Sequence, residues 1–405
     1  MTETALQTNR PDDGGSKIRR HAHVLSSQLQ TMRATMYPPE ARKKLRPFLT
    51  HEVSKLTSIP ESTLKLLSQA GRGPIPDRQE KNNHRVYTLG QINELRATMA
   101  AERPADALRF LPHRRANEHL QIIAISNFKG GSAKTTTAVH LSQYLALQGY
   151  RVLAVDLDPQ ASLSAMFGAQ PEIDIGPNQT IYAALRYDDD RRPLKEVIRE
   201  TYFEGLHLIP GNLEVMEYEH DTPRILATRQ SGAGGIFFER LRDVLQQVEA
   251  DYDIIVLDTP PSLGFLTLGA IYAATGMIVT VHPAMLDVAS MSQFLLMMSD
   301  LTDEINKAGA TLAQDFFHYL ITRHDPIDKP QTGMVTLLRH LFGSDVLVPT
   351  AIASTAIEAA GLAKQSLYEV EPGAIRRETY RRARDAMDEV NAAILELITT
   401  SWGRP

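Results

Sequence analysis

The sequence predicts an α/β fold in which a helix-flanked, mainly parallel sheet follows an α-helical domain. Six short aliphatic runs lie between residues 121 and 322, and helical stretches separate them. Several runs are apolar throughout rather than alternating, as expected for strands that are buried on both faces of a parallel sheet. The runs are QIIAIS (121–126), RVLAVDLD (151–158), LHLIPG (206–211), DIIVLD (253–258), MIVTVH (277–282) and FHYLIT (317–322).

The composition excludes several classes of protein. The chain has 405 residues, of which 43% are hydrophobic, and it has no cysteine. Disulfides, thiolate metal sites and cysteine nucleophiles are therefore excluded. No apolar run approaches the roughly 18 residues of a membrane span, and the polar N-terminus lacks the apolar core of a signal peptide. We expect a cytoplasmic protein with two or three domains.

Charge is unevenly distributed along the chain. The first 120 residues carry 20 Lys and Arg against 12 Asp and Glu. In the rest of the chain Asp and Glu outnumber Lys and Arg, so that the whole chain has a net charge of −5. Such a division favours a basic part that faces nucleic acid and a separate acidic body. A basic tail without a target is the simpler alternative.

The first 37 residues are expected to form a tail and a helix. Residues 1–16 contain Pro, Asp and Gly and are predicted to be disordered. Residues 17–37 carry apolar side chains at heptad spacing, which suits pairing with a second helix or packing against the same chain. The a positions are Ile18, Leu25 and Met32, and the d positions are Ala22, Leu29 and Met36.

Residues 40–100 are predicted to form a winged helix-turn-helix domain. Thr50 is placed to cap a short helix whose inner face carries Val53 and Leu56. After a turn at 57–60, a second helix begins at a proline, which is tolerated in a first turn. That helix carries Leu64, Leu66 and Leu67.

The wing is assigned to the basic stretch Arg78–Tyr87, and Thr88–Met99 is expected to be a closing helix. Residues 101–119 contain prolines and no clear period, so we interpret them as a linker. The α/β domain is expected to occupy residues 120–405.

A phosphate-binding loop is predicted between the first aliphatic run and the helix that follows it. The sequence SNFKGGSAKTTT places Gly130, Gly131, Ser132 and Ala133 between a strand and a helix that opens with Lys134, Thr135 and Thr136. Loop amides and the helix N-terminus can point at phosphates, and small residues let the backbone approach. Lys134 is expected to reach the β- and γ-phosphates, and the Thr135 hydroxyl to bind Mg²⁺. This context predicts a P-loop NTPase.

The loop departs from the strict G-x-x-x-x-G-K-[ST] pattern at two positions. Phe128 and Ala133 stand where that pattern has glycines. The match is to the deviant form K-G-G-x-G-K-T-T, in which Lys129 is the signature lysine. Ala133 is the departure from this form, and its Cβ would strain the loop if the backbone needs a positive φ.

Three carboxylates end neighbouring apolar runs. Asp258 resembles a Walker B aspartate and is expected to hold Mg²⁺, with Asp156 as a further candidate ligand beside Thr135. Asp156 and Asp158 are two residues apart on a strand and so share a face. Gly-Gly turns and acidic strand ends are common in α/β folds, so the argument depends on their combination and order.

These residues resemble the ParA/MinD group of deviant Walker ATPases. The resemblance is carried by Lys129–Thr137, Val155–Gln160 and Asp253–Ser262, and the N-terminal helix with a helix-turn-helix is similar to the long ParA subclass. Longer stretches resemble the partitioning ATPases of repABC plasmids. They include TMYPPEARKKLR, LALQGYRVLAVDLDPQASLSAMFG, LIPGNLEVMEYEHDTPR and VHPAMLDVASMSQFLLM.

The resemblance implies an ATPase that binds ATP or ADP with Mg²⁺ and forms a face-to-face homodimer. Lys129 would reach the phosphates of the other protomer, Lys134 and Thr135 would act in cis, and Asp158 would orient the attacking water. Hydrolysis would be weak until DNA and a ParB-like or RepB-like centromere-binding partner stimulate it. A nucleoid-associated plasmid-partitioning protein that also represses its own operon is implied.

Two DNA surfaces are expected. Operator binding would use Ser62, Thr63 and Lys65 on the helix-turn-helix and Arg85 on the wing. Non-specific binding would use Arg377, Arg381 and Arg384, which share one helix face. A solvated face partly paired with acidic neighbours is the alternative for these arginines.

Two further interpretations remain open. Thr322 and Arg323 follow a predicted strand and could approach the adenine or ribose, although a plain loop is the simpler interpretation. A repressor with negligible ATPase activity, whose nucleotide only sets its conformation, is the alternative function. Membrane cycling is disfavoured because the C-terminal helix carries mainly acidic charges, whereas membrane-surface helices carry Lys and Arg.

Overall fold

The computed structural model describes residues 14–36, 43–79, 83–228, 237–307, 309 and 311–404. The chain forms two units, residues 1–43 and residues 44–405. The first unit contains helix α1 (Gly14–Met36), which begins three residues before the predicted start; residues 1–13 of the predicted tail lie outside the described part. Ile18 and Leu25 of the proposed heptad are exposed in this unit. The side chains of Leu29, Met32 and Met36 are not among those described, so pairing through this helix stays a prediction.

The second unit begins with a small module of helices and an antiparallel sheet in the order β1-β3-β2. Helix, turn, helix and hairpin occur in the predicted order. We call residues 44–102 the winged module after the winged helix-turn-helix that the sequence predicts, an assignment that stays a prediction. Its elements are β1 (Phe48–Leu49), α2 (Thr50–Thr57), α3 (Glu61–Gln69), β2 (Asp77–Arg78), β3 (Arg85–Tyr87) and α4 (Leu89–Glu102).

One predicted detail of this module is wrong. Thr50 is the first helical residue rather than the cap, and its hydroxyl donates to the Arg85 carbonyl at 3.4 Å. Glu52 instead accepts from the Leu49 amide at 2.9 Å, because its side chain reaches back to the free start of α2. Leu66 is 65% exposed, since it lies on the outer face of α3.

The predicted linker contains ordered structure. It includes the 3₁₀ helix η1 (Pro104–Asp106) and helix α5 (Ala107–Phe110), and Phe110 is buried. The Arg114 amide donates to the Asp253 carboxylate at 2.9 Å. Burial of one aromatic ring and a hydrogen bond to a distant carboxylate, neither visible as a sequence period, order this segment.

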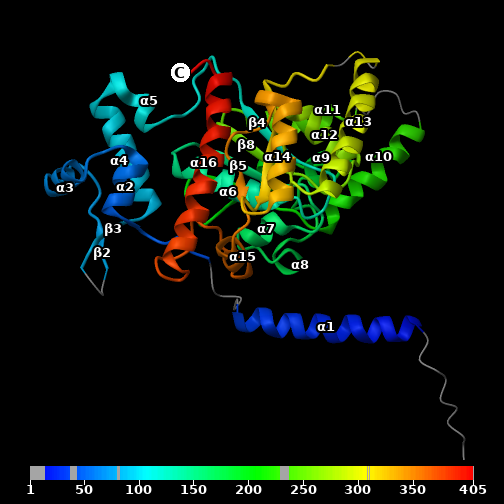
Figure 1. The fold of residues 1–405 in the computed structure, drawn as a ribbon, viewed down its shortest axis with the longest axis horizontal. Helices are drawn as coiled ribbons and strands as arrows, with labels where there is room; N and C mark the ends of the chain where they lie inside the picture. Colours follow the sequence, from blue (N-terminus) through cyan, green and yellow to red (C-terminus); the bar gives the residue numbers. More distant parts are fainter. Residues whose placement is uncertain are drawn as a thin grey trace, which may run out of the picture. The chain divides into compact units, whose positions relative to one another are not determined.

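The main sheet has eight strands in the order β11-β10-β9-β4-β8-β5-β7-β6, with β6 antiparallel and the other pairings parallel. Figure 1 labels its central strands β4, β8 and β5. All six predicted runs are strands. The edge strands β6 and β11 were not predicted, because two residues carry no period. The strands are β4 (Gln121–Ser126), β5 (Val152–Asp156), β6 (Arg199–Glu200), β7 (Leu206–Ile209), β8 (Ile254–Asp258), β9 (Gly276–Val281), β10 (Phe316–His324) and β11 (Ala351–Ile352).

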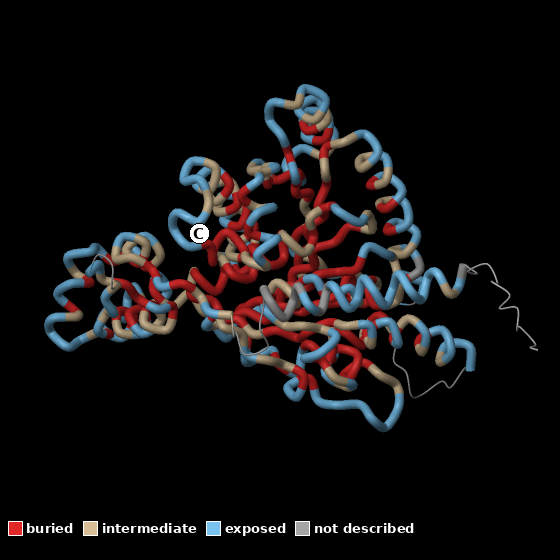
Figure 2. The backbone as a smooth tube through the Cα atoms, turned by 90° about the horizontal axis from the view of Figure 1, so that it is seen from below, coloured by how far each residue is buried: buried red, intermediate tan, exposed pale blue. Residues whose placement is uncertain are grey.

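Helices cover both faces of this sheet, and Figure 2 shows the strands as buried backbone between exposed helical surfaces. Odd-numbered residues of β4, such as Ile123, pack with α6 and α16, whereas Ile122 packs with α11 and α12 on the other face. The larger helices are α6 (Lys134–Leu147), α10 (Glu217–Ala227), α11 (Glu239–Gln246), α12 (Phe265–Ala273), α13 (Met285–Lys307), α14 (Lys329–Phe342), α15 (Thr355–Leu362) and α16 (Arg377–Ser401). The short ones are α7 (Ser162–Met166), α8 (Pro171–Asp174), α9 (Tyr182–Leu185), η2 (Leu194–Glu196), η3 (Leu213–Met216) and η4 (Gly343–Asp345).

None of the described helices is both long and apolar enough to cross a membrane.

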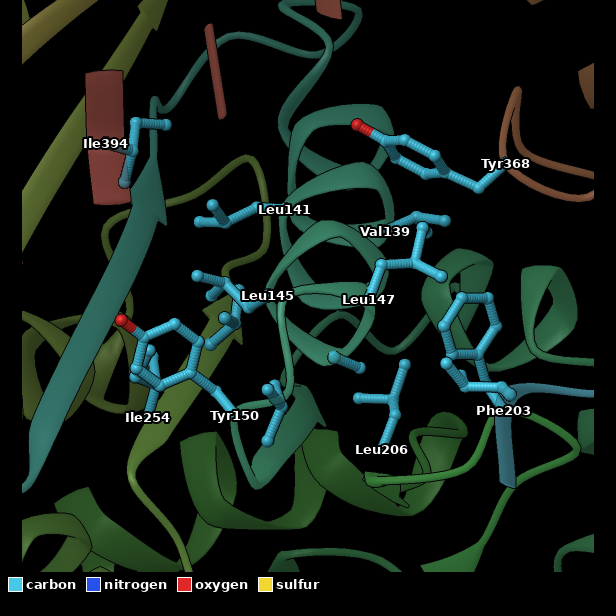
Figure 3. Packing of buried hydrophobic residues seen from close by; sticks show 14 of the residues in the cluster. Val139, Leu141, Leu145, Leu147, Tyr150, Phe203, Leu206, Ile254, Tyr368 and Ile394 are labelled. Atoms are coloured by element: carbon cyan, nitrogen blue, oxygen red, sulfur yellow. The ribbon is translucent and has the colours of Figure 1, made fainter. Parts of the chain in front are cut away.

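Helix α6 lies in the centre of the core. Its side chains Val139, Leu141 and Leu145 pack among buried residues from β7, β8 and α16 (Figure 3). A polar contact joins it to residues 366–369: His140 Nδ1 lies 2.7 Å from the Thr136 carbonyl, and its Nε2 accepts from the Leu367 amide at 3.2 Å. These partners fit the neutral imidazole with its proton on Nδ1. Burial lowers the pKa of His140 to about 4.

This burial predicts acid-sensitive stability. The unfolded chain binds a proton at His140 near pH 6.5, but the folded chain binds it only near pH 4. The contribution of His140 to the free energy of unfolding is therefore fully present above pH 6.5. It is lost as the pH falls toward 4, and the loss amounts to at most about 3 kcal/mol. In urea unfolding between pH 4 and 7, His140→Gln should show a smaller pH-dependent loss than wild type. His51→Gln, at an exposed position, is the control, and equal pH profiles for wild type and His140→Gln would contradict this origin.

Candidate functional site

The predicted phosphate loop connects the end of β4 to the start of α6, and side chains from β9 and β10 fix its shape. Thr280 donates to the Ser132 hydroxyl at 3.0 Å, and Thr322 donates to the Ser132 carbonyl at 2.9 Å. Asn127 donates to the Thr280 carbonyl and accepts from the Lys129 amide at 2.8 Å. Side chains of β9 and β10 therefore hold the loop before any ligand is considered.

Backbone angles explain the small residues in this loop. Gly131 has φ +80° and Ala133 has φ +68°. Because Ala133 has a positive φ, its Cβ strains the loop. An alanine in this left-handed conformation costs roughly 1–2 kcal/mol. An added Cβ at Gly130 would meet nothing within 4 Å, so the backbone there is open to a ligand.

Lys134 and Thr135 open α6, where unpaired helix amides and the helix dipole favour anions. Lys134 is 6% exposed, and its ammonium donates to the Lys129 carbonyl at 3.2 Å. Burial lowers the pKa of Lys134, and the nearby Asp258 and Asp158 oppose that shift. A buried ammonium beside free helix amides is suited to a polyanionic ligand.

Asp258 ends β8 in the centre of the sheet and is fully buried. Within the described part of the chain, no donor lies in hydrogen-bonding geometry to either carboxylate oxygen of Asp258. Burial raises the pKa of Asp258 well above its ordinary value, Asp156 raises it further, and the Thr135 hydroxyl lowers it. An unpartnered buried carboxylate beside a threonine hydroxyl fits Mg²⁺, which often binds one or two carboxylates together with substrate phosphates.

Asp156, a predicted metal ligand, already accepts hydrogen bonds from its own chain, so its metal role stays a prediction. One oxygen accepts from the Ser164 amide at 2.8 Å and the Ser164 hydroxyl at 2.6 Å, and the other accepts from the Asp158 amide at 3.2 Å. Burial raises the pKa of Asp156. Ser164 in turn accepts from the Gly211 amide at 2.9 Å. Asp156 therefore organises the ends of β5 and β7, because a donor set from α7 already occupies it.

Asp158 lies at the edge of the same site. It is 9% exposed, and one of its oxygens accepts from the Gln160 amide at 2.8 Å. Its charge acts on Lys134. The structure thus brings together Lys134, Asp158 and Asp258, as predicted from three separate segments.

Lys129 points away from the phosphate loop of its own chain. Its ammonium pairs with Asp287 in the first turn of α13 at 2.9 Å, and the two side chains are 34% and 16% exposed. No sequence pattern singled out Asp287, since an acidic residue in a helix first turn is common.

Thr322 and Arg323 lie within β10, so the plain-loop interpretation is wrong. Arg323 has φ +52°, at an irregularity in the pairing with β11. Its guanidinium donates to the Gly131 carbonyl at 3.2 Å. A strained, non-glycine residue in contact with a phosphate loop is typical of a functional position.

The predicted DNA-contacting residues differ in exposure. Ser62 and Lys65 are exposed on α3, and Thr63 and Arg85 are half-buried. Arg377 and Arg381 are exposed at the start of α16.

Arg384 does not share the surface expected of it. Its guanidinium stacks 4.1 Å from the Tyr368 ring centroid, pairs with Asp388 at 3.1 Å and leaves the side chain 19% exposed. The alternative of pairing with acidic neighbours holds for this arginine.

Comparison with known proteins agrees with this geometry. Residues 120–309 match the family described as an AAA domain. A putative replication protein A of Rhizobium rhizogenes is 50% identical over 389 residues, which cover 96% of this chain and 95% of the relative. SopA of Escherichia coli K12 is 30% identical over 315 residues, which cover 76% of this chain and 77% of SopA.

Solved structures share the fold. A partition protein superposes with a TM-score of 0.67 at 19% identity and covers 97% of this chain and 100% of its own. The ATP complex of a Cyanothece McdA variant superposes with a TM-score of 0.55 at 20% identity. The match covers 68% of this chain and 97% of the McdA chain.

Ala133→Gly tests the strain in the loop. Glycine relieves the roughly 1–2 kcal/mol cost of a left-handed alanine but gives the unfolded chain more conformational entropy, which costs roughly 0.4–1 kcal/mol. The free energy of unfolding should therefore rise by at most about 1.5 kcal/mol. The hydrogen bonds from Thr280 and Thr322 already fix the loop, so ATP affinity should change less than about threefold. Chemical denaturation and nucleotide titration measure both. A gain of tenfold or more in affinity would show that Ala133 distorts the loop.

Proposed function

The chain belongs to the ParA family of partition ATPases, and on that premise we propose that it hydrolyses ATP to segregate a plasmid. The observation that carries the proposal is the buried, unpartnered Asp258 beside Thr135 and Lys134 at the start of α6. ATP or ADP is the proposed ligand, with Mg²⁺. The known ATP complex of a protein with this fold supports that choice.

The residues divide the work of phosphoryl transfer, in which positioning and charge neutralisation dominate. The amides of Gly130–Thr136 bind the phosphates, and Lys134 reaches the β- and γ-phosphates. Thr135 and Asp258 would hold Mg²⁺, which neutralises charge that develops on the phosphate oxygens. Asp158 orients the attacking water, and Arg323 lies where it can approach the nucleotide.

Dimerisation is proposed to bring Lys129 to the phosphates of a second copy. Its partly exposed ammonium is directed to Asp287 rather than to its own Lys134, so the pair must separate for Lys129 to act in trans. Beside Asp287, Met285 and Leu286 are 70% and 76% exposed. Exposed apolar residues next to a signature lysine support a contact surface at this place.

DNA binding is proposed at two surfaces. The winged module would bind an operator through Ser62, Thr63, Lys65 and Arg85 and so repress its own operon. Arg377 and Arg381 would bind nucleoid DNA non-specifically. A ParB-like or RepB-like centromere-binding partner would stimulate hydrolysis.

A repressor with negligible ATPase activity is the second candidate. The strained Ala133 favours it, because a deviant loop that binds nucleotide without turnover could still set the orientation of the winged module. The two candidates differ in partner-dependent hydrolysis.

ATP turnover distinguishes them. The full chain should hydrolyse ATP slowly alone and at least about tenfold faster with duplex DNA and the centromere-binding partner. Lys134→Ala should lose nucleotide binding, because the phosphates lose their buried cation, whereas Lys129→Ala should keep binding and lose stimulation. Arg72→Ala, in an exposed ion pair far from the loop, is the matched control. Wild-type stimulation in Lys129→Ala would contradict the trans role, and no stimulation of the folded wild type would favour the repressor.

A further inference from the structure

Arg96 of α4 is a buried cation between the winged module and the α/β domain. It is 1% exposed. Its guanidinium donates to the Asn93 side chain at 2.8 Å, to the Leu56 carbonyl at 3.2 Å and to the Leu147 carbonyl. These contacts join the winged module to the main domain through one side chain.

Both carbonyls belong to helix C-termini. Leu147 is the last residue of α6, where Gly149 turns the chain with φ +96°, and Leu56 lies in the last turn of α2. Terminal carbonyls lack intrahelical donors and carry the negative end of the helix dipole. Arg96 therefore caps the first helix of the helix-turn-helix and the phosphate-loop helix at the same time.

The charge of Arg96 depends on these carbonyls. Among the described residues it forms no ion pair within 4 Å, and burial lowers its pKa to about 10. A buried guanidinium without a carboxylate is costly unless its hydrogen bonds are satisfied. A Cβ at Gly149 would lie 3.2 Å from the Arg96 side chain, so Arg96 packs closely against the chain just after the α6 terminus.

The same helix begins at the nucleotide site. Lys134 and Thr135 are at its N-terminus, and Leu147, labelled in Figure 3, is at the other end. At 1.5 Å per residue the helix is about 20 Å long and acts as one rigid element.

The rest of the junction is open on one side. A cavity of about 830 Å³ separates α2 from α16 and is lined by His51 and Lys55 on one wall and Tyr380 and Arg381 on the other. The winged module therefore does not fill this side of its junction with the α/β domain.

We propose that Arg96 is a positioning residue that couples nucleotide binding at the phosphate loop to DNA binding by the winged module. The inference rests on the proposed function, since it requires both activities. When phosphates bind and α6 moves, the position of the Leu147 carbonyl that Arg96 holds changes. Arg96 then carries α4 with it, and α2 through the Leu56 carbonyl. Linkage requires DNA to change nucleotide affinity by the same factor by which nucleotide changes DNA affinity.

The test measures this factor in both directions. The full chain is titrated with a duplex from upstream of its own coding sequence, with and without Mg²⁺ and ATP, and then with ATP with and without that duplex. A scrambled duplex of equal length reports non-specific binding. Wild type should give one factor in the typical range of about 5 to 150. In Arg96→Met the coupling factor should fall to less than about two, where one means no coupling. The affinity for ATP in the absence of DNA should stay unchanged.

Matched variants separate coupling from stability. Arg96→Lys should keep part of the factor, because an ammonium can still reach one carbonyl. Arg72→Met, which breaks the exposed pair with Glu102 inside the winged module, should keep all of it. If Arg96→Met fails to fold, Asn93→Ala removes the acceptor that orients the guanidinium and should lower the factor.

Specific outcomes would overturn the inference. A wild-type factor in folded Arg96→Met, or equal losses in Arg96→Met and Arg72→Met, would show that Arg96 does not carry the coupling. A wild-type protein that binds ATP and DNA with no mutual effect would also refute it and would leave the proposed function intact. A wild type that binds neither ligand would instead contradict the proposed function.

Discussion

The structure depends most on a carboxylate that is buried without a partner in the centre of a parallel sheet. Asp258 of β8 is in register with Asp156 of β5, and both are fully buried. Two adjacent carboxyls in the interior raise each other's pKa and cannot both stay ionised at low cost. The chain satisfies Asp156 with Ser164 and leaves Asp258 to Lys134, Thr135 and an external cation. The strand order places β8 between β4, which leads into α6, and β5, which ends at Asp156.

Helix α6 connects this site to the rest of the molecule. Its N-terminus provides the amides for phosphates, its centre contributes core packing and His140, and Arg96 caps its C-terminus. Because one helix carries all three contacts, a change at the phosphate loop reaches the winged module through rigid structure. The ion pair between Lys129 and Asp287 adds a second contact, from the loop to α13, that must separate before Lys129 reaches another chain.

Local patterns predicted most of the fold. Apolar runs identified the six long strands because strands buried on both faces must be apolar, and Lys134, Thr135 and Asp258 were found because phosphate and metal chemistry restrict their types. The loop pattern singled out Ala133 as the place where a positive φ would cause strain, and the structure has φ +68° there. Asp287, Ser164 and Arg96 were missed because their partners are distant in sequence. Thr50 and Arg384 were misplaced, since the reach of Glu52 and the contacts of Arg384 with Tyr368 and Asp388 decide their surroundings.

Calorimetry of ATP binding tests the central claim most directly, with and without Mg²⁺, near pH 7 in two buffers of different ionisation enthalpy. Burial raises the pKa of Asp258 and so favours its protonated form, whereas Mg²⁺ favours the ionised form. We expect tight binding that requires Mg²⁺ and releases protons in wild type, and no Mg²⁺-dependent release in Asp258→Asn. Binding of equal strength without Mg²⁺, with no proton release in wild type, would contradict the account.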